Sequence, residues 1–532
     1  MSRRLWVLSA AMLVVGLVSR PALAGGGSSA DKAALVRYKL SHGYLVGDQA
    51  RFDRLKAQAA AAAARLHPSA NTAVSPHDPV ARPSFEGLNE NDLAPPDPTG
   101  AAGPFSYLQA INLQVGIYSR TGTLVASAPF STLTGSGADF LSDPQMLWDP
   151  NTNRFYYLIL DVGNELNPKS TMLWGFSKTN NPTKIPSSFC NYVTDFGWGG
   201  TIADYPKLGT TTDFLLIGVN IYPNLVTFLE SDVGWISKPQ GTNPIKKCPR
   251  ASSFKSGKQT ALLNDDGATL SSTPEPAQQV DPSSSGWIVS VPDPTNSGAT
   301  GDKLELYQVT KNPDGTANIQ KVGTPVAVAH YSPPPPAPQK GSAHTIDTLD
   351  GRLIHAVSAV DPAHGTATAL WTSHAVFGGA GSEVRWYEID VANAALFQSG
   401  TVNDAALYAF NGSVSSDRVY VSSTQKGFGN NLVVNFSTSS TTAYPAIQMV
   451  SKVGANPRSG FVLVKQSPGP EDGFDCFQLG KCRWGDYSGA LPDPAAPLIG
   501  IVGKVWMDNM WASGNIDPLN ATWRTWIWAA TP

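Results

Sequence analysis

Short runs of alternating apolar and polar residues dominate the chain from Asp97 onward, and turn residues separate them. The first group opens at Asp97-Pro98-Thr99-Gly100 and continues through strand-like runs at residues 107–112 and 115–118. The last group closes with the run at residues 523–528. Alternation with a period of two predicts β-strands with one buried face, and clusters of Gly, Pro, Asn and Asp predict the turns between them.

The groups share a loose internal order, in which a polar residue is followed by a turn and then by a hydrophobic strand. Seven residues open such groups: Asp97, Asp143, Asp204, Glu275, His344, Asp404 and Asp486. Repeats of ~40–60 residues with about four strands each are typical of a β-propeller, whose blades pack radially around a central channel. We therefore predict an all-β fold, a seven-bladed β-propeller over residues 97–532. A β-sandwich array is the alternative.

A different pattern precedes the repeats. Leu35, Tyr38, Phe52 and Leu55 are spaced as one face of a helix, and residues 59–64 are all alanine, a residue with high helix propensity. Residues 67–96 are rich in Pro, Asn and Ser and lack periodicity. The prediction is a short helical N-terminal extension over residues 25–66, followed by a linker or strap over residues 67–96.

The first residues have the three parts of a secretory signal peptide. Arg3-Arg4 is a positive start, residues 5–18 are apolar, and Ala22-Leu23-Ala24 is a small-residue cleavage site. This order predicts a signal peptide over residues 1–24 and a secreted, extracellular protein.

Export also gives an interpretation of the cysteines. The chain has four of them, an even number that suits disulfide bonds in an oxidising compartment. Proximity in the sequence favours the pairs Cys190–Cys248 and Cys476–Cys482. Their spacings match no zinc-binding pattern.

Composition and charge narrow the functional classes. The formal net charge is −3 and no basic run occurs, so the sequence lacks the electrostatic footprint of a nucleic-acid-binding protein. After the leader no run approaches ~18 apolar residues, which predicts no membrane span. Serine-hydrolase, nucleotide-binding and zincin motifs are absent from the sequence. We expect a monomer.

No cofactor or metal site is predicted. Asp265-Asp266-Gly267 and Asp472-Gly473 are candidate calcium turns, but neither has the density of oxygen ligands of a recognised calcium loop. His344 and His355 fall on opposite faces in the simplest strand register, which favours structural roles for both.

Four segments, residues 97–112, 143–157, 203–220 and 483–494, resemble a loose group of secreted bacterial β-propeller proteins. This group is sialidase-like, and most of its members have no assigned activity. The resemblance spans about residues 90 to 530 and implies the architecture, without implying catalytic residues. The chain lacks the Ser-x-Asp-x-Gly-x-x-Trp turns of true sialidases, so sialidase activity is not predicted.

If each unit begins at its innermost strand, the opening acids surround one mouth of the channel. Carboxylates gathered in a concave site acquire different pKa values, and glycoside hydrolysis needs one protonated acid and one ionised carboxylate. Asp143, Asp204 and Asp486 are the predicted catalytic residues. The residues predicted to contact the substrate are Trp148, Tyr205, His344, Arg483, Trp484 and Tyr487.

Two functions remain open from the sequence. One is a secreted glycoside hydrolase that uses paired carboxylates at the channel mouth. The other is a non-catalytic propeller that binds an extracellular glycan or a cell-surface protein. An aspartate before Pro or Tyr at the start of a strand also commonly satisfies backbone N–H groups, which gives each acid a purely structural interpretation.

Overall fold

The structure is a computed structural model of the chain, and it describes residues 45–46, 48–66, 78–137, 139–164, 167–199, 201–222, 228–292, 300–420, 427–495 and 502–532. The predicted signal peptide lies outside these residues. No helix among the described residues is long and apolar enough to cross a membrane.

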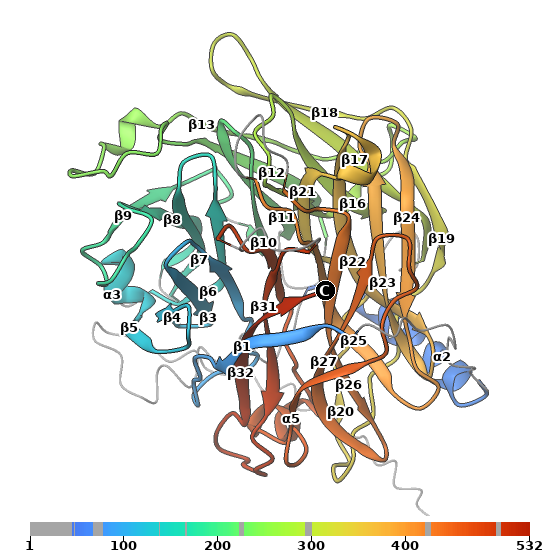
Figure 1. Ribbon diagram of the computed structural model, residues 1–532. Coiled ribbons are helices and arrows are strands. Elements are labelled where there is room, and N and C mark those ends of the chain that lie inside the picture. The colour runs from blue at the N-terminus through green and yellow to red at the C-terminus, as the bar shows by residue number, and fades with distance from the viewer. Residues whose placement is uncertain are drawn as a thin grey trace, which may run out of the picture.

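Antiparallel sheets arranged around a common centre make up the molecule, and in Figure 1 the colours pass round this centre from cyan through green and yellow to red. The first strands of neighbouring sheets contact one another, with β2 against β6, β6 against β10, and β25 against β30. Strand β30 in turn contacts β2 and closes the ring. This radial packing is that of an all-β propeller, as predicted.

Five sheets of four or five strands are separate blades. The first two contain β2 (Thr99–Ala102), β3 (Ser106–Ile111), β4 (Gln114–Ser119) and β5 (Leu124–Pro129), and β6 (Leu141–Asp149), β7 (Arg154–Asn164), β8 (Asn167–Ser177) and β9 (Phe189–Thr194). The third contains β14 (Ser271–Pro276), β16 (Gly286–Pro292), β17 (Gly301–Lys311), β18 (Ala317–Lys321) and β19 (Val326–Tyr331). The other two contain β25 (Tyr408–Ser416), β26 (Asn431–Ser440), β27 (Ala443–Val453) and β28 (Val462–Gln466), and β30 (Gly489–Pro492), β31 (Val505–Ala512), β32 (Trp523–Thr531) and β1 (Val80–Glu86).

One further sheet is continuous over nine strands. Its order is β13 (Ser256–Gln259), β12 (Glu230–Ser237), β11 (Phe214–Tyr222), β10 (Ile202–Thr210), β15 (Gln278–Gln279), β21 (Leu353–Val360), β22 (Thr368–Gly378), β23 (Gly381–Asp390) and β24 (Ala395–Val402). Its central strand β15 is only two residues long and pairs in parallel with β10 on one side and β21 on the other. A two-stranded sheet joins β20 (Thr345–Ile346) to β29 (Lys481–Cys482).

The prediction of seven blades is therefore wrong. Five blades are self-contained sheets, and the sequence units that open at Asp204 and His344 belong to the same nine-stranded sheet. The physical reason is β15, because Gln278 pairs with Thr210 on one side and with Val357 on the other, which joins two groups of strands that are far apart in the sequence. A sequence pattern shows where strands begin, whereas it does not show which strand edges pair.

Strand β1 closes the propeller from the N-terminal side. It pairs antiparallel with β32, from Val80 opposite Thr531 to Glu86 opposite Trp526. Part of the predicted linker or strap is thus the fourth strand of the last blade. In Figure 1 this blue strand lies beside the C-terminus.

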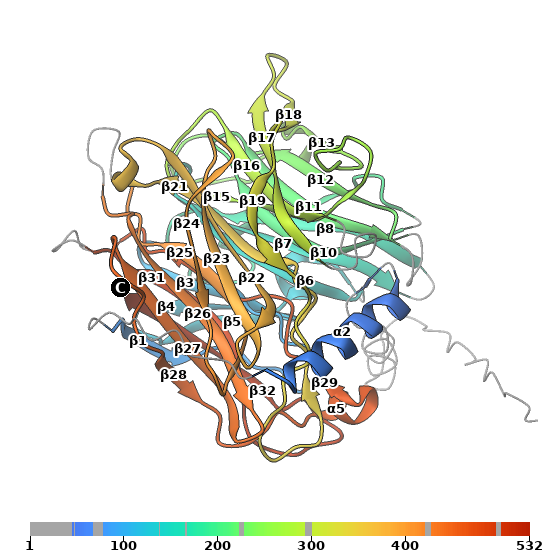
Figure 2. The same ribbon diagram turned by 90° about the vertical axis from the view of Figure 1, so that its right-hand side faces the viewer.

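Few helices occur among the described residues: α2 (Gln49–Ala63), α3 (Phe130–Thr134), α5 (Phe474–Leu479), and the 3-10 turns η1 (Ala251–Ser253) and η2 (Pro362–His364). Helix α2 belongs to the N-terminal extension, and the Asp48 side chain caps it by accepting a hydrogen bond from the Arg51 N–H. In Figure 2 this helix runs along the outside of the strands.

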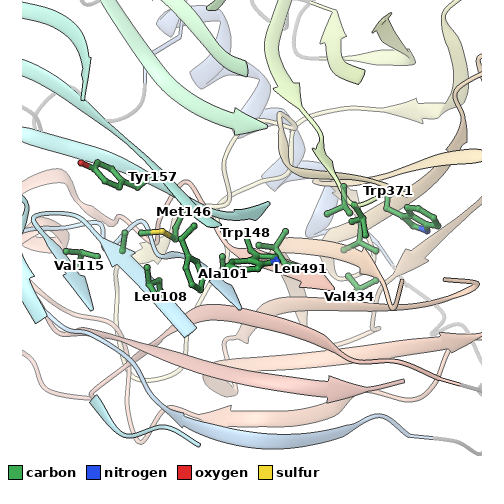
Figure 3. Close-up of a cluster of buried hydrophobic side chains, with 14 of the residues drawn as sticks. Ala101, Leu108, Val115, Met146, Trp148, Tyr157, Trp371, Val434 and Leu491 are labelled. Atoms are coloured by element: carbon green, nitrogen blue, oxygen red, sulfur yellow. The ribbon is translucent and has the colours of Figure 1, made fainter. Parts of the chain in front are cut away.

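Apolar side chains from several sheets meet in a shared core cluster. Figure 3 shows part of it, including Leu108, Met146, Trp148, Trp371 and Leu491, which come from strands far apart in the sequence. Their burial between neighbouring sheets holds the inner strands close together, which positions the residues at the mouth of the channel.

Candidate functional site

The first strands carry a recurrent backbone distortion. Asp143, Tyr205, Thr273 and Asn411 have positive φ values of 53°, 57°, 52° and 46°, and the strand register shifts at each of these places. The next residue is proline in the first three strands and glycine in the fourth. Such bulges redirect side chains and often occur beside binding sites.

Three acids from distant parts of the chain gather at this distorted end. Asp97 Oδ1 accepts a hydrogen bond from the backbone N–H of Asp486 at 2.8 Å, and its Oδ2 accepts one from Asn112 Nδ2 at 2.7 Å. The Asn112 Oδ1 atom in turn accepts from the Asp143 N–H at 2.9 Å. One amide side chain therefore joins the loops that carry Asp97 and Asp143.

Arg483 supplies a buried positive charge to this group. Its guanidinium Nη2 atom lies 3.0 and 3.1 Å from the two carboxylate oxygens of Asp486. The Arg483 backbone N–H donates to Asp475 Oδ2 at 2.7 Å, which fixes the start of the loop. A partner of this kind offsets part of the cost of desolvating a buried carboxylate.

The environment of Asp97 changes its proton affinity. Burial, followed by the negative charges of Asp486 and Asp143, raises the pKa of Asp97 to about 7, although the charge of Arg483 and the hydrogen bond from Asp486 act in the opposite direction. The mouth therefore contains one carboxyl group that holds a proton near neutral pH beside a carboxylate that is paired with an arginine. We call Asp97, Asp143, Asp486 and Arg483 the mouth cluster.

Two tyrosines lie against the mouth cluster. Tyr205 and Tyr487 stack with their ring centroids 5.0 Å apart, and the Tyr205 hydroxyl donates to the Asp486 carbonyl at 2.8 Å. The ammonium of Lys207 lies 4.3 Å from each ring centroid, and the guanidinium of Arg352 lies 4.5 Å from the Tyr205 ring. These contacts bury both rings, which are 2% and 1% exposed.

The N-terminal extension covers this end of the channel. We call its described residues, 45–46 and 48–66, the cover segment. The Leu45 N–H lies 3.4 Å from Asp204 Oδ2, and the Leu45 carbonyl accepts from the Tyr222 hydroxyl at 2.8 Å. Val46 and Phe52 pack in a small apolar cluster with Leu349 and Ile354.

A buried lysine also anchors the cover segment. Lys56 Nζ donates to the Leu349 carbonyl at 2.5 Å and to Thr348 Oγ1 at 3.1 Å, and it lies 3.9 Å from Asp347 Oδ1. Burial lowers the pKa of Lys56 to about 8, with the charge of Asp347 opposing the shift. Hydrogen bonds and apolar packing therefore hold the cover segment in place more than the ion pair with Asp347 does.

A small cavity lies between the inner strands. Its volume is about 20 Å³, and residues of β2, β6, β10, β15, β21 and β30 line it. This volume suits one water molecule. Three buried polar atoms of its lining residues, Gln278 Oε1, His355 Nε2 and the Tyr487 hydroxyl, lack a hydrogen-bond partner among the described residues. The space is too small for a sugar.

The structure brings some predicted site residues together and separates others. Asp143, Asp486, Arg483, Tyr205 and Tyr487 meet at the mouth, and the Asp204 carboxylate contacts the Leu45 N–H of the cover segment. Trp148 instead packs edge-on against Phe155 in the core, with ring centroids 4.8 Å apart. Trp484 is also buried, and its indole N–H donates to Ser437 Oγ at 2.9 Å.

His344 contacts α5 and the turn that precedes this helix. Its Nδ1 atom is 2.7 Å from Asp472 Oδ1, and its ring meets Phe477 edge-on at 5.1 Å. The contact with Asp472 also occupies one of the two candidate calcium turns. In the other turn, Asp266 accepts hydrogen bonds from the Ala268 and Thr269 N–H groups and from Thr269 Oγ1.

Several residues at the mouth were not predicted from the sequence. Asn112 and the left-handed residues Thr273 and Asn411 belong to this end of the channel, and Lys56 and Lys207 supply buried charges there. The available signal was the Pro or Gly that follows each left-handed residue in the first strands, which marks a break in strand geometry.

Both predicted disulfides are formed. Cys190 and Cys248 are joined, as are Cys476 and Cys482. Groups of three potential metal ligands among the described residues are Asp472 with Cys476 and Cys482, Glu471 with Asp475 and Cys476, and Asp361 with His364 and Glu388. The first two use disulfide-bonded sulfurs, so they are poor ligand sets, and none of the three includes a mouth acid.

Comparison with known proteins gives weak structural similarities. No family model and no curated protein matches the chain. A Dos1 propeller aligns with 85% of this chain and 95% of its own at 9% identity, with a TM-score of 0.35. An exo-β-1,3-galactanase from Phanerochaete chrysosporium aligns with 85% of this chain and 98% of its own at 10% identity, with a TM-score of 0.30. An α-L-arabinofuranosidase from Lactobacillus brevis aligns with 57% of this chain and 86% of its own at 9% identity, with a TM-score of 0.27.

Proposed function

We propose that the protein is a secreted, carbohydrate-active propeller of the glycoside hydrolase type, whose reaction centre is the mouth cluster. The observation that carries the proposal is the position of Asp97, whose pKa is raised to about 7 by burial and by the adjacent acids. A protonated acid next to carboxylates is the arrangement that hydrolysis of a glycosidic bond needs.

The proposed roles follow from the partners of each acid. Asp97 donates its proton to the leaving glycosidic oxygen as the bond from the anomeric carbon to that oxygen breaks. Asp143 is the catalytic carboxylate, and water supplies the hydroxyl group of the product and restores the proton of Asp97. Asp486 is committed to Arg483 at 3.0 Å, so it maintains the charge balance that keeps Asp97 protonated.

The proposal includes a latent state, in which the cover segment lies over the site. Leu45 occupies the place next to Asp204, and the apolar contacts of Phe52 hold the segment down. A glycan reaches the mouth cluster only after Leu45 moves. Displacement of the cover segment is therefore part of the proposal, and Asp204 then faces the substrate with Tyr205 below it.

A glycan-panel assay that records both binding and product release tests the proposal. We expect the Phe52→Ala variant, with a loosened cover segment, to release product faster than the wild type. Asp97→Asn or Asp143→Asn in that background should lower turnover by about 10²–10⁴-fold. Asp404→Asn is the matched control, because this acid caps a turn outside the mouth cluster. Turnover equal to the parent in both Asn variants would exclude the assigned site.

A non-catalytic binding propeller is the second candidate. The observation that favours it is that protein groups already engage the mouth acids, with Arg483 on Asp486 and two hydrogen bonds on Asp97. Binding without product release in the Phe52→Ala variant, unchanged by Asp97→Asn, supports this candidate against hydrolysis.

A further inference from the structure

A second group of acids lies at the opposite end of β21 from the cover segment. Asp361 follows β21 directly, His364 ends the 3-10 turn η2, and Glu388 belongs to β23. One potential ligand atom from each of the three residues lies within 4.8 Å of the other two. We call these three residues the rim cluster. The mouth cluster shares no residue with it.

The two carboxylates of the rim cluster are buried. Asp361 and Glu388 are each 1% exposed. Two acids in such a place need a cation or a proton between them, because their mutual repulsion is strong in a poorly solvated environment. The ammonium of Lys452 donates to the Gly454 carbonyl, and its positive charge offsets part of the negative charge of the two carboxylates from a distance.

In each carboxylate, one oxygen accepts a hydrogen bond from an N–H group and the other oxygen does not. Asp361 Oδ1 accepts from the Ala363 N–H at 2.8 Å, whereas Asp361 Oδ2 is the oxygen that lies 3.7 Å from His364 Nε2. Glu388 Oε2 accepts from Gln398 Nε2 at 2.5 Å. No described N–H or hydroxyl group donates to the buried Glu388 Oε1, and the carboxyl groups of Glu388 and Asp361 lie within hydrogen-bonding reach of each other. Carboxylates that bind metals are commonly oriented by a hydrogen bond to one oxygen, which leaves the other oxygen for the metal.

The third ligand is held in position by an aromatic ring. The imidazole of His364 stacks on Phe397 with ring centroids 3.7 Å apart and an interplanar angle of 5°. Stacking fixes the ring plane, so little side-chain entropy remains to be lost on binding. The His364 side chain is 38% exposed, which gives an ion access from solvent.

We propose that Asp361 Oδ2, His364 Nε2 and Glu388 Oε1 form a binding site for one divalent transition-metal ion, with water in the remaining positions. One imidazole with two carboxylates suits Zn²⁺ or Mn²⁺ better than Mg²⁺ or Ca²⁺, which prefer oxygen ligands alone. The role of Gln398 is to orient Glu388, and that of Phe397 is to orient His364.

Calorimetric titration of chelator-treated, full-length protein with ZnCl₂ tests the site, with MnCl₂ and MgCl₂ in parallel. We expect one Zn²⁺ per chain, weaker Mn²⁺ and the weakest Mg²⁺. His364→Ala should abolish this stoichiometric binding, and Gln398→Ala should weaken it by about 10–100-fold. Co²⁺ bound to the wild type should give a visible absorption band that His364→Ala removes.

Two variants make the result decisive. Glu388→Gln keeps the shape of the side chain and the contact with Gln398 but removes the charge, so it should fold and lose Zn²⁺. His330→Ala removes an exposed histidine outside the rim cluster and should bind as the wild type does. The proposal is overturned if the wild type binds no Zn²⁺, in which case a proton lies between the two acids, or if His364→Ala binds Zn²⁺ as tightly as the wild type.

Discussion

Individual residues at the channel mouth combine a strained backbone with buried charge. Thr273 is β-branched and still has a φ of 52°, a conformation that costs a non-glycine residue roughly 1–3 kcal/mol. The side chain of Asn220 holds it there, since Asn220 Oδ1 accepts from the Thr273 N–H at 2.8 Å and Asn220 Nδ2 donates to Thr273 Oγ1 at 3.0 Å. The acids of the mouth cluster have similar supports, as Asn112 shows for Asp97 and Asp143.

Buried histidines should make the stability of the protein depend on pH. His374 is fully buried, with Nδ1 at 2.8 Å from the Gly351 carbonyl and Nε2 at 2.9 Å from the Tyr387 hydroxyl. Burial lowers the pKa of His374 to about 3. As the pH falls below the ordinary histidine pKa of about 6.5, the unfolded chain takes up a proton that the folded chain refuses until about pH 3. This difference favours unfolding by about 1.4 kcal/mol for each pH unit in that window.

Urea unfolding of the wild type and of His374→Gln between pH 4 and pH 7 measures this contribution. Glutamine keeps a donor and an acceptor but does not titrate. The wild type should therefore lose stability on acidification more steeply than His374→Gln, by up to about 1.4 kcal/mol per pH unit. His330→Gln, a change at an exposed histidine, should leave the slope unaltered. Parallel slopes for the wild type and His374→Gln would contradict a neutral buried imidazole.

For single residues, the sequence was a better guide to the acids at the mouth than to the aromatic residues expected beside them. All seven opening residues were predicted to surround the mouth; Asp97, Asp143 and Asp486 do lie near one another, whereas His344 pairs with Asp472. Trp148 follows Asp143 by only five positions, yet β6 carries it down into the core. Five positions along an extended strand place two side chains far apart, and a sequence motif does not show in which direction the strand runs.

Strand packing depends on glycines where two sheets approach closely. Gly218 on β11 faces β14, and a Cβ atom built on it would lie 2.0 Å from the Pro274 carbonyl oxygen. Because that atom belongs to the backbone, it cannot rotate away as a side chain can. Close approach of this kind lets neighbouring inner strands converge at the channel.

Gly218→Ala should therefore destabilise the protein strongly, by about 3 kcal/mol or more, because the overlap forces β11 and β14 apart. Chemical denaturation monitored by tryptophan fluorescence measures the change. The control is Gly137→Ala, since no atom lies within 4 Å of a Cβ built there. This variant should stay within about 0.5 kcal/mol of the wild type. Equal effects of the two substitutions would contradict the packing of β11 against β14.

The sequence predicted the strands with a long hydrophobic alternation, whereas it did not predict a strand in which only two residues are paired. Strands such as β3 and β32 fall in the runs that the pattern marks, whereas β15 contains only Gln278 and Gln279. Two polar residues give no periodicity, so their pairing with both β10 and β21 leaves no trace in the sequence. The error in the number of blades follows from these two residues.

The whole molecule is closed by contacts between distant parts of the chain. Strand β1 completes the sheet of β32, the cover segment lies over the mouth, and β15 joins β10 to β21. None of these contacts is local, so each depends on chain segments that meet only in the folded state. Disulfide bonds also join separate parts of the chain, and unlike these contacts they restrict the unfolded chain as well.

The two disulfides should contribute unequally to the stability of the folded molecule. Cys190–Cys248 joins residues 58 positions apart, and Cys476–Cys482 joins residues 6 positions apart. In the chain-entropy description, loops of these lengths restrict the unfolded chain by about 4 and about 2 kcal/mol. Removal of the long link should therefore lower the melting temperature more than removal of the short link.

Alanine replacements are preferred, because Cys476 and Cys482 are fully buried and a serine hydroxyl there would add a separate desolvation cost. Thermal melts of the two double-alanine variants and of the wild type measure the difference, and an equal or reversed order would show that strain or packing outweighs loop entropy.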